Sequence, residues 1–454
     1  MQIINNFVNS FVFWAAWIII PVIMEIVPAF GSIYVLIKKH IKKMVYEDPI
    51  MYPEITLIIP VYNSQDSLEE CIRSIHESDY PNDKIKIYLV NNQGQDNSFE
   101  VFHECQEKYP NLMMQWMNAM QGKSKALNLA LFNSDGKYII HIDSDGQLEK
   151  KALKNMVKKF EADSSVDCMT GAILTEPSRI EQYHGIFAKL LRKLEFMEYA
   201  QAFLAGRNYA SETNNIYTLS GAFSAFRKSA VLKSQLYNTD TICEDTQITF
   251  QMRYIQKKKV HICENAIFFV DPIEDMNKLY TQRQRWQRGS LEVSHQFLKK
   301  ELHPYKLFTN VTVRTLMYDH TFAFPRMIWY LALLCLLCMN YSFSLIVYST
   351  LFIFFLYIVI GYLYFASTIG FLSEFKELRS YYKKQWYVVA LLPLFNLLVF
   401  FIRFAGVINS INTDSAWKTR NLTEEKQAFM DSVKDDVKGI SGIYQKIKDW
   451  VNAQ

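Results

Sequence analysis

The stretch Lys137–Gly146, KYIIHIDSDG, decides the fold. An apolar run, Tyr138–Ile142, leads directly into two carboxylates one residue apart, Asp143 and Asp145, and Gly146 follows them. The run predicts a buried strand, and Gly146 predicts the turn that ends it. Because side chains alternate along a strand, we expect both carboxylates on one side of its tip, where Mg²⁺ or Mn²⁺ would relieve their repulsion. The alternative is an ordinary Asp-rich turn after a strand.

The segments before this stretch alternate between strand and helix patterns. We expect strands at Ile55–Pro60, Ile85–Val90 and Met113–Met117, and helices at Ser67–Ser78, Asn97–Lys108 and Ser124–Phe132. This alternation predicts an α/β domain with a parallel, doubly wound, Rossmann-like sheet, in which ligands bind beyond the carboxyl ends of the strands. Tyr62, Asn91, Asn92 and Asp143 all follow predicted strand ends. The pattern therefore indicates a nucleotide-type site.

The second half of this region is less regular. We expect helices at Phe187–Leu204, from near Lys228, at Thr246–Ile255 and at Asn277–Phe297. The last contains TQRQRWQRG, which places Gln282, Arg285, Trp286 and Arg288 at helical spacings over about two faces. One face of this helix would point toward the predicted nucleotide-type site. The arginines, Arg283 included, could also form a basic face for anionic lipid headgroups.

Composition limits the class of protein. The chain has 454 residues, 50% of them hydrophobic, and long uncharged runs crowd its two ends while the middle is typical of a soluble domain. A net charge of +4 is too small to argue for a nucleic-acid partner. The seven cysteines have no paired spacing in the soluble part, so we expect no disulfide framework and a reducing compartment.

The N-terminal run predicts a membrane anchor. Residues from about Phe7 to Ile37 are almost uncharged and are followed by a basic segment, 38–43. The run is longer than the ~20 residues that a span needs and lacks a small-residue cleavage site, which favours an anchor over a signal peptide. The basic flank places the following domain in the cytoplasm. Glu25 either faces other helices or marks the break between a surface helix and a span.

The C-terminal runs predict three further spans, near Arg326–Asn340, Phe343–Leu372 and Tyr387–Ile408. Three spans would put the tail outside, yet Trp417–Arg420 looks like a functional cytoplasmic element, so the two signals disagree. We expect amphipathic surface helices at Phe187–Leu204 and Leu307–Phe322. The expected organisation is an anchor (1–44), a cytoplasmic domain (54–301), an interfacial helix (302–324), transmembrane helices (325–410) and a tail (411–454).

Taken together, four motifs resemble those of a known family. They are Pro60-Val61-Tyr62, Asp143-Ser144-Asp145, Cys243-Glu244-Asp245 and the QRQRW of 282–286, in that order. The set is similar to the family-two membrane glycosyltransferases with a GT-A fold, the synthases of poly-N-acetylglucosamine, hyaluronan and cellulose, and to the exosortase-associated glycosyltransferases of Gram-positive bacteria. The resemblance covers about Ile55–Ser290 and the layout of flanking spans.

The resemblance implies roles for the donor-binding residues. Tyr62, after Pro60, would pack on the uracil of a UDP-sugar, and Asn91-Asn92 stands where an acidic pair usually reads the uracil N3–H. Lys123 would contact the diphosphate, Asp143 belongs to the D-x-D pair, and Asp145 would hold the metal. Gln282, Arg285 and Trp286 would close over the diphosphate and the acceptor.

The resemblance also implies an acceptor side. Ser220, Gly221 and Ala222 match the segment beneath the acceptor sugar, with Glu244 beside them, and Asp245 matches the general base. Without the resemblance, Lys123 is a solvated loop lysine, Asp245 a helix N-cap and Trp286 a core residue. We expect neighbours such as Trp286 to desolvate Asp245 and raise its pKa.

Three positions depart from the family pattern. Asn91-Asn92 lacks the carboxylate that would accept from uracil N3–H, although an amide oxygen can still accept. Ser64 stands where many relatives carry Glu, and Cys243 replaces a Thr. None of these changes removes a chemically essential group.

The function implied is a metal-dependent (Mg²⁺ or Mn²⁺), inverting transfer from a UDP-sugar to a growing polysaccharide, coupled to export, in a multi-pass protein of a bacterial plasma membrane. One alternative is a single transfer to a lipid carrier or another acceptor. A second is a non-catalytic sugar-nucleotide sensor. Expected partners are the UDP-sugar, a polysaccharide or lipid-linked acceptor, membrane lipids, and an accessory export protein or a second copy, with no nucleic acid.

Overall fold

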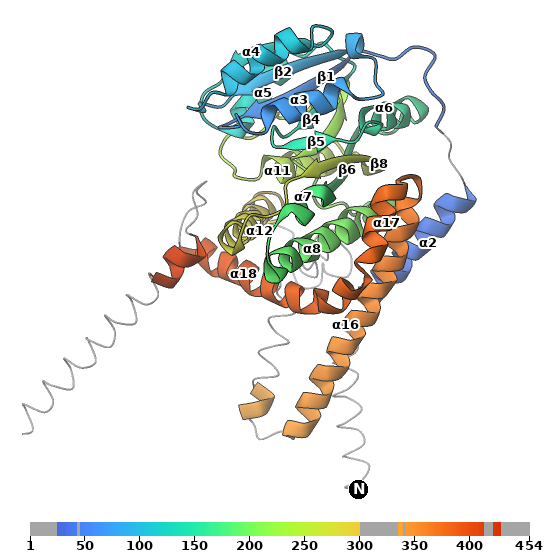
Figure 1. Cartoon of the computed structure of the whole chain (residues 1–454), viewed down its shortest axis with the longest axis vertical. Helices are drawn as coiled ribbons and strands as arrows, with labels where there is room; N and C mark the ends of the chain where they lie inside the picture. The colour runs from blue at the N-terminus through green and yellow to red at the C-terminus, as the bar shows by residue number, and fades with distance from the viewer. Residues whose placement is uncertain (1–24, 43–45, 300–334, 339–341, 413–420, 428–454) are drawn as a thin grey trace, which may run out of the picture.

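The computed structural model describes residues 25–42, 46–299, 335–338, 342–412 and 421–427 (Figure 1). Its centre is one eight-stranded sheet with the strand order β3-β2-β1-β4-β7-β6-β8-β5. The strands are β1 Ile55–Val61, β2 Ile85–Asn91, β3 Met113–Asn118, β4 Tyr138–Ile142, β5 Gly146–Leu148, β6 Cys168–Thr175, β7 Phe223–Arg227 and β8 Val260–Val270.

The first half of the sheet follows the prediction. β1 pairs in parallel with β2 and β4, and β2 pairs in parallel with β3. Neighbouring residues of β1 enter different cores, because Leu57 packs in a cluster with α3 and α6 while Ile58 packs in a cluster with α5. Helices therefore cover both faces of the sheet, as a doubly wound fold requires (Figure 1). These helices are α3 Leu68–His76, α4 Ser98–Lys108, α5 Lys123–Asn133 and α6 Ala152–Ala162.

The second half adds antiparallel strands that the sequence analysis did not predict. β7 is antiparallel to both β4 and β6, and β5 is antiparallel to β8. The helix expected from near Lys228 is confirmed as the short α10 Lys228–Val231, and β7 lies between it and the segment Ser220-Gly221-Ala222. β7 escaped the sequence analysis because it has only five residues, FSAFR, and four consecutive ones are buried, so alternation gives no signal.

Gly136 sets the approach of the chain to β1. A Cβ atom there would lie 2.5 Å from the backbone nitrogen of Thr56 and 2.7 Å from the carbonyl carbon of Ile55. The Gly136 N–H also donates to Thr56 Oγ1 at 3.0 Å. Backbone atoms leave no room for a side chain, so the chain can enter β4 beside β1 only with glycine here.

We therefore expect Gly136→Ala to lower the unfolding temperature, with a loss of about 1–3 kcal/mol in stability, the usual cost of overpacking. Thermal unfolding of the purified full chain measures this decrease in unfolding temperature. Gly206→Ala is the matched control, because its nearest contact for a Cβ is the Gln201 carbonyl oxygen at 3.6 Å. Equal unfolding temperatures for the two variants would contradict the packing argument.

A second layer of helices lies below the sheet (Figure 1). Its members are α2 Val27–Ile41, α7 Pro177–Gln182, α8 Ile186–Ala200, α9 Arg207–Glu212, α11 Glu244–Phe250, α12 Met276–Leu298, α16 Phe343–Phe371, α17 Lys376–Lys384 and α18 Leu392–Asn412. The expected helix at Phe187–Leu204 is α8 followed by a π-helical segment, Gln201–Gly206. One hydrophobic cluster joins side chains of α8, α16, α17 and α18 with β6.

The basic flank after the N-terminal run contacts the sheet domain. Lys38 pairs with Glu212, and Lys39 pairs with Glu264 and donates to Asn208 Oδ1 at 2.6 Å. α2 is therefore held to α9 and β8 by charge, and it packs along α16 (Figure 1). Of the expected anchor, residues 1–24 lie outside the described residues.

Two helical segments are long and apolar enough to cross a membrane, Ile346–Glu374 and Trp386–Ser410, among the residues that the structure describes. They match the expected runs Phe343–Leu372 and Tyr387–Ile408. The run Arg326–Asn340, apart from 335–338, lies outside the described residues, as do Leu307–Phe322 and Trp417–Arg420. All seven cysteines are free thiols.

Candidate active site

Asp143 and Asp145 lie in the connection between β4 and β5, not on the strand itself. Gly146 does not make a turn but opens β5, and a Cβ there would lie 2.3 Å from a ring carbon of Phe268. Ser144, between the two carboxylates, has its Oγ 2.7 Å from Ser64 Oγ. Ser64, which departs from the family pattern, thus connects the loop after β1 to the loop that carries the two carboxylates.

Lys123 is the central cation of the site. It is the first residue of α5, and its Nζ lies 2.6 Å from Asp143 Oδ1 and 3.3 Å from Glu244 Oε1. Its side chain is only 19% exposed, so it is not the solvated loop lysine of the alternative interpretation. Burial lowers the pKa of Lys123, but the carboxylates of Asp143 and Glu244 outweigh burial and hold the pKa above its usual range. Lys123 therefore stays charged.

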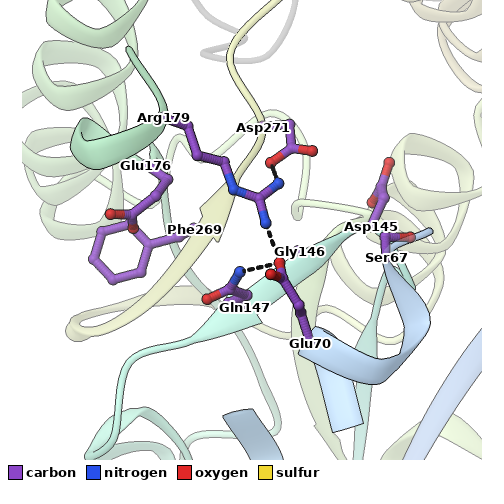
Figure 2. Close-up of a pocket in the computed structure, with 9 residues that line it drawn as sticks. All are labelled: Ser67, Glu70, Asp145, Gly146, Gln147, Glu176, Arg179, Phe269 and Asp271. Carbon is purple, nitrogen blue, oxygen red and sulfur yellow. Dashed lines mark hydrogen bonds and ion pairs between the residues drawn. The ribbon is translucent and has the colours of Figure 1, made fainter. Parts of the chain in front are cut away.

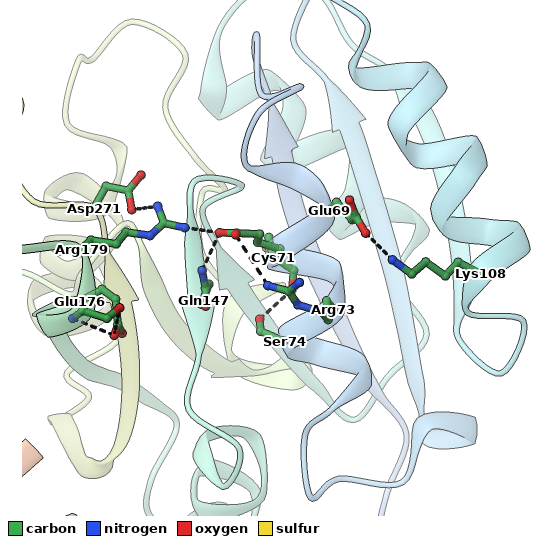
Figure 3. Close-up of polar contacts among 11 residues, drawn as sticks. Glu69, Cys71, Arg73, Ser74, Lys108, Gln147, Glu176, Arg179 and Asp271 are labelled. Carbon is green, nitrogen blue, oxygen red and sulfur yellow. Dashed lines mark hydrogen bonds and ion pairs between the residues drawn. The ribbon is translucent and has the colours of Figure 1, made fainter. Parts of the chain in front are cut away.

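Asp145 projects beside a small cavity whose lining includes four other charged side chains, Glu70, Glu176, Arg179 and Asp271 (Figure 2). In this cavity Arg179 of α7 bridges Glu70 of α3 and Asp271, which follows β8. Glu70 also accepts from Gln147 Nε2 at 2.7 Å. Figure 3 shows that Glu70 also pairs with Arg73 of α3 at 3.7 Å, and that a separate pair, Glu69 with Lys108 of α4 at 2.5 Å, lies on the other side of the helix. The sequence analysis missed this network, because its members lie on separate elements.

Asp145 is the carboxylate best suited to hold a cation. Asp145 is exposed to solvent, yet partial desolvation by the surrounding protein and then repulsion from Asp143 raise its pKa to about 6. No described side chain donates a hydrogen bond to its carboxylate. Among the described residues no three His, Cys, Asp or Glu side chains gather as a metal cluster. Two carboxylates fit Mg²⁺ or Mn²⁺, which complete their shells with water and phosphate oxygens.

Asp245 lies in the first turn of α11. Cys243 is the residue before this helix, so Asp245 is not the N-cap of the alternative interpretation. Its Oδ2 accepts from the backbone N–H of Gly221 at 3.1 Å, and its Oδ1 accepts from Thr246 N at 2.6 Å. Burial and then the charge of Glu244 raise the pKa of Asp245 to about 6, as the sequence analysis expected. The expected contribution of Trp286 to this desolvation stays a prediction.

The segment 220–222, which is expected to lie beneath the acceptor, connects the loop of Asp143 with Asp245. The backbone N–H of Asp143 donates to the carbonyl of Ala222 at 3.2 Å, and Gly221 holds Asp245. A Cβ on Gly221 would come within 3.2 Å of Asp245 Oδ2. The structure thus brings Lys123, Asp143, Glu244, Asp245 and the segment 220–222 together, at the carboxyl end of β4.

The sequence analysis missed Arg207, on α9. Its guanidinium stacks 4.1 Å from the ring of Phe203 and donates to Thr170 Oγ1 at 3.1 Å. The same hydroxyl accepts from the backbone N–H of Ser220 at 3.1 Å, so Arg207 supports the acceptor segment through Thr170. Burial lowers the pKa of Arg207 to about 10, and Asp245 opposes that fall. Arg207 is a lone arginine in the sequence, with no motif around it.

We expect Arg207→Gln to raise the pKa of Asp245, because the variant removes a positive charge that favours the ionised carboxylate. The shift should stay below about one unit, since Arg207 acts through Thr170 rather than touching the carboxylate. The pH profile of transfer measures it, with Arg207→Lys as the charge-preserving control. A profile that did not move in Arg207→Gln, or that moved equally in Arg207→Lys, would contradict this role.

The residues expected to read the base are engaged in local contacts. Asn92 is buried, and its Oδ1 accepts from the N–H of Gly122 at 2.6 Å, which positions the loop before Lys123. Asn91 Oδ1 accepts from Gly94 N at 2.9 Å, and its Nδ2 donates to Asn118 at 3.1 Å. Asn91 lines a cavity of about 310 Å³ at the β2–β3 edge.

Pro60 and Tyr62 lie at the end of β1. Pro60 is within the strand, opposite Val90 of β2, and Tyr62 follows it with an exposed ring. An exposed aromatic face leaves room for a stacked base. The role of both residues in base binding stays a prediction.

The α12 helix corrects the expectation of a basic lipid-binding face. Arg283 is buried, pairs with Glu198 of α8 at 2.5 Å, and stacks 4.6 Å from the ring of Trp286. Arg288 is buried as well. Charged side chains enclosed in protein cannot reach lipid headgroups, so that expectation is wrong. Arg283 can be buried because Glu198 of α8 supplies a carboxylate that pairs with its charge.

The motif residues of α12 occupy its other sides. Trp286 is half-buried and packs against the main core, while Gln282 and Arg285 are also half-buried. The backbone carbonyl of Arg285 lies 4.0 Å from the Cys243 thiol. A Cβ on Gly289 would lie 2.0 Å from the same sulfur. α12 therefore packs directly against the start of α11, close to Asp245 in the chain.

Comparison with known proteins agrees with this geometry. Residues 56–234 match the family model described as glycosyl transferase family 2. The chain carries a family 2 glycosyl transferase domain. This domain contains the Lys123–Asp143 pair and both residues of the carboxylate loop. Its fold is GT-A, because the structure resembles a mannosyltransferase from Pyrobaculum calidifontis in complex with GDP-Man and Mn²⁺, with a TM-score of 0.55 and 17% identity over 87% of this chain and 98% of that one.

Sequence relatives of the chain include polysaccharide synthases. A poly-beta-1,6-N-acetyl-D-glucosamine synthase of Staphylococcus aureus is 25% identical over 277 residues, 60% of this chain and 64% of the relative. The synthase of the same name from Staphylococcus epidermidis is 23% identical over 347 residues, 73% of this chain and 79% of the relative. The match thus spans less than two thirds of the length of the S. aureus relatives.

Proposed function

We propose that the chain is a membrane-bound, inverting glycosyltransferase that moves a sugar from a UDP-sugar to a growing polysaccharide and is coupled to its export. The observation that carries this proposal is the Lys123 bridge. One cation joins Asp143, of the carboxylate loop, to Glu244, which neighbours the predicted base Asp245. The carboxylate loop of the family 2 domain and the segment of the predicted base therefore share one site.

Each residue of the site has a distinct role in the proposed transfer. Asp245 takes the proton from the acceptor hydroxyl as the oxygen forms its bond to the anomeric carbon. The bond between that carbon and the diphosphate oxygen breaks, and the diphosphate leaves with its electron pair. Lys123 and Arg285 stabilise the charge that grows on the leaving group. Gly221 holds the base through its N–H, which keeps one carboxylate oxygen of Asp245 oriented.

Asp145, with Asp143, would hold a divalent cation. The cation would supply Lewis-acid stabilisation of the leaving diphosphate. Asp143 already pairs with Lys123, which leaves Asp145 as the main protein ligand. Its raised pKa supports this role, because a cation would relieve the repulsion that raises it.

We expect transfer to fall as the pH drops through about 6. The pKa of Asp245 is about 6, so the base is ionised above that pH and protonated below it. The logarithm of kcat/KM should therefore rise with pH with unit slope at low pH and level off above about pH 7. Initial rates between about pH 5 and 8 test it, and a profile already flat at the acid end would contradict the assignment.

A panel of radiolabelled sugar nucleotides tests the function itself. Membranes containing the full chain are incubated with each UDP-sugar, and with GDP-Man, in the presence of Mg²⁺ or Mn²⁺. Long products from a UDP-sugar support the proposal. A lipid carrying one sugar would indicate single transfer instead, and tight UDP binding without turnover would indicate a sensor.

A further inference from the structure

The loop 232–243 connects α10 to α11 and leads directly into Glu244 and Asp245. It contains no helix or strand of its own, so its path depends on the side chains that bind its backbone. Its residues 235–237 are hydrogen-bonded on two sides, to α5 and to the helical segment that continues α11. This 235–237 segment therefore connects two elements that both contribute residues to the site.

Asn128 of α5 binds the 235–237 segment with both ends of its side chain. Its Oδ1 accepts from the backbone N–H of Tyr237 at 2.9 Å, and its Nδ2 donates to the Tyr237 carbonyl at 2.8 Å. The Tyr237 side chain is buried, and its Oη lies 2.9 Å from Nδ1 of His141 in β4. Tyr237 is thus fixed to the two elements that position Lys123 and Asp143, since α5 begins with Lys123 and β4 leads to Asp143.

Gln251 binds the 235–237 segment from the other side. It follows α11 directly, in the π-helical segment Gln251–Ile255, and its side chain is buried. Its Oε1 accepts from the backbone N–H of Gln235 at 2.7 Å, and its Nε2 donates to the carbonyl of Leu236 at 2.8 Å. The Nε2 group also donates to Gln247 Oε1 of α11 at 2.7 Å. The 235–237 segment therefore links α11 to α5 through neutral hydrogen-bonding groups.

Another link between α5 and α11 is charged. It is the ion pair of Lys123 with Glu244, whose atoms are 3.3 Å apart. Under the proposed function Lys123 also stabilises the diphosphate of the donor. An incoming diphosphate competes with Glu244 for Lys123, so the charged link weakens in the step in which Asp245 must face the acceptor. The neutral link has no such competitor.

We propose that Asn128 is a positioning residue for the transfer. Through the 235–237 segment it holds α11, and with it Asp245, in place while the donor engages Lys123. The inference rests on the proposed function, because it takes Lys123 to bind the diphosphate. A neutral amide suits this role, because it fixes the helix without adding a charge beside Asp245. The position of Asp245 matters, since a misplacement of about 1 Å can cost about 10²-fold in rate.

Asn128→Leu in the full chain tests the proposal by its kinetics. Leucine keeps a branched side chain and removes both hydrogen bonds to Tyr237. We expect kcat to fall by about 10–10²-fold and KM for the UDP-sugar to stay the same, because the donor residues remain in place while the base moves. A wild-type kcat in this variant would overturn the proposal.

Asn133→Leu is the matched control for this substitution. Asn133 is exposed on the same helix, and its Nδ2 donates to the Leu129 carbonyl of that helix at 2.8 Å. The control makes the same chemical change without touching the 235–237 segment, so we expect a wild-type kcat. A loss of kcat as large as that of Asn128→Leu would overturn the proposal.

A destabilising control separates positioning from a loss of folded protein. Tyr88→Phe removes the hydrogen bond from the buried Tyr88 Oη to the Asn133 carbonyl at 2.6 Å, which ties α5 to β2 and not to α11. We expect a lower unfolding temperature and a wild-type kcat. If kcat fell with the unfolding temperature alike in Tyr88→Phe and Asn128→Leu, the proposal would be wrong.

Gln251→Leu breaks the same link from the side of α11 and serves as the second variant should Asn128→Leu not fold. It removes the two hydrogen bonds to residues 235 and 236 and leaves Asn128 in place. We expect kcat to fall with KM for the UDP-sugar unchanged. A wild-type kcat in Gln251→Leu would overturn the proposal.

Hydrogen exchange gives a readout that does not depend on turnover. The backbone N–H of Gly221 donates to Asp245 Oδ2 at 3.1 Å, so its exchange rate reports whether Asp245 is in place. With UDP and Mg²⁺ bound, we expect faster exchange at Gly221 and along α11 in Asn128→Leu than in the wild type. Without UDP the difference should be smaller, because the Lys123–Glu244 pair still holds α11. Equal exchange in the two UDP-bound proteins, or a difference that UDP does not change, would overturn the proposal.

The wild type separates this inference from the proposed function. A wild type that transferred no sugar from any sugar nucleotide would overturn the proposed function. A wild type that transferred sugar, beside an equally active Asn128→Leu variant, would overturn only the role of Asn128.

Discussion

Asp245→Asn should abolish sugar transfer and leave UDP binding largely intact. The amide keeps the shape of the side chain, and its oxygen can still accept from Gly221 N, so the acceptor segment stays in place. It cannot take a proton from the acceptor hydroxyl. The expected loss in kcat is about 10²–10⁴-fold, the range for a positioned general base.

Initial rates with a saturating UDP-sugar and calorimetric titration with UDP measure the two effects separately. Asp240→Asn is the matched control, because it makes the same chemical change on an exposed carboxylate shortly upstream. We expect it to behave as the wild type. Wild-type turnover by Asp245→Asn would show that another group takes the proton. Loss of UDP binding in that variant would show that Asp245 holds the donor.

Asp145→Asn should remove the dependence of UDP binding on the divalent cation. The variant eliminates a carboxylate that accepts no hydrogen bond from a described side chain, and with it the repulsion that raises the pKa of Asp145. The folded protein should therefore not lose stability, while transfer falls by about 10²–10³-fold, the loss expected for one preorganised charge-stabilising group. UDP titrations at several Mg²⁺ and Mn²⁺ concentrations test the binding effect.

Asp83→Asn serves as the control for this experiment. Asp83 is exposed and precedes β2, at the amino ends of the strands and away from the carboxylate loop. Its metal titration should match that of the wild type. If the curves for Asp145→Asn also matched, Asp145 would not be the metal ligand, and the arrangement around Lys123 would need another explanation.

The first half of the domain was predictable because its elements are local. Strands β1, β2 and β4 are predominantly apolar runs, and the polar residues at their ends mark the site edge directly. Asp143 and Lys123 meet because α5 leads into β4 within a parallel α/β unit. In the sequence analysis only the family resemblance placed Lys123 at this site, since the residue alone predicts a solvated loop lysine.

The rest of the site depends on contacts between distant segments. β7 reverses direction, and only that reversal places Gly221 against Asp245. Arg207 contacts Thr170, 37 residues away, through one hydroxyl. The burial of Arg283 follows from Glu198 on a different helix. None of these partners has a periodic or spaced pattern, so local sequence could not pair them.

The shared position of Lys123 has a consequence for the timing of the reaction. A diphosphate arriving beside Asp143 competes with Glu244 and Asp245 for the field of the same ammonium group. As that field is drawn toward the incoming nucleotide, the proton affinity of Asp245 rises. Under the proposed function, the acceptor hydroxyl meets its strongest proton acceptor only after the donor is loaded, which favours ordered kinetics with the donor bound first.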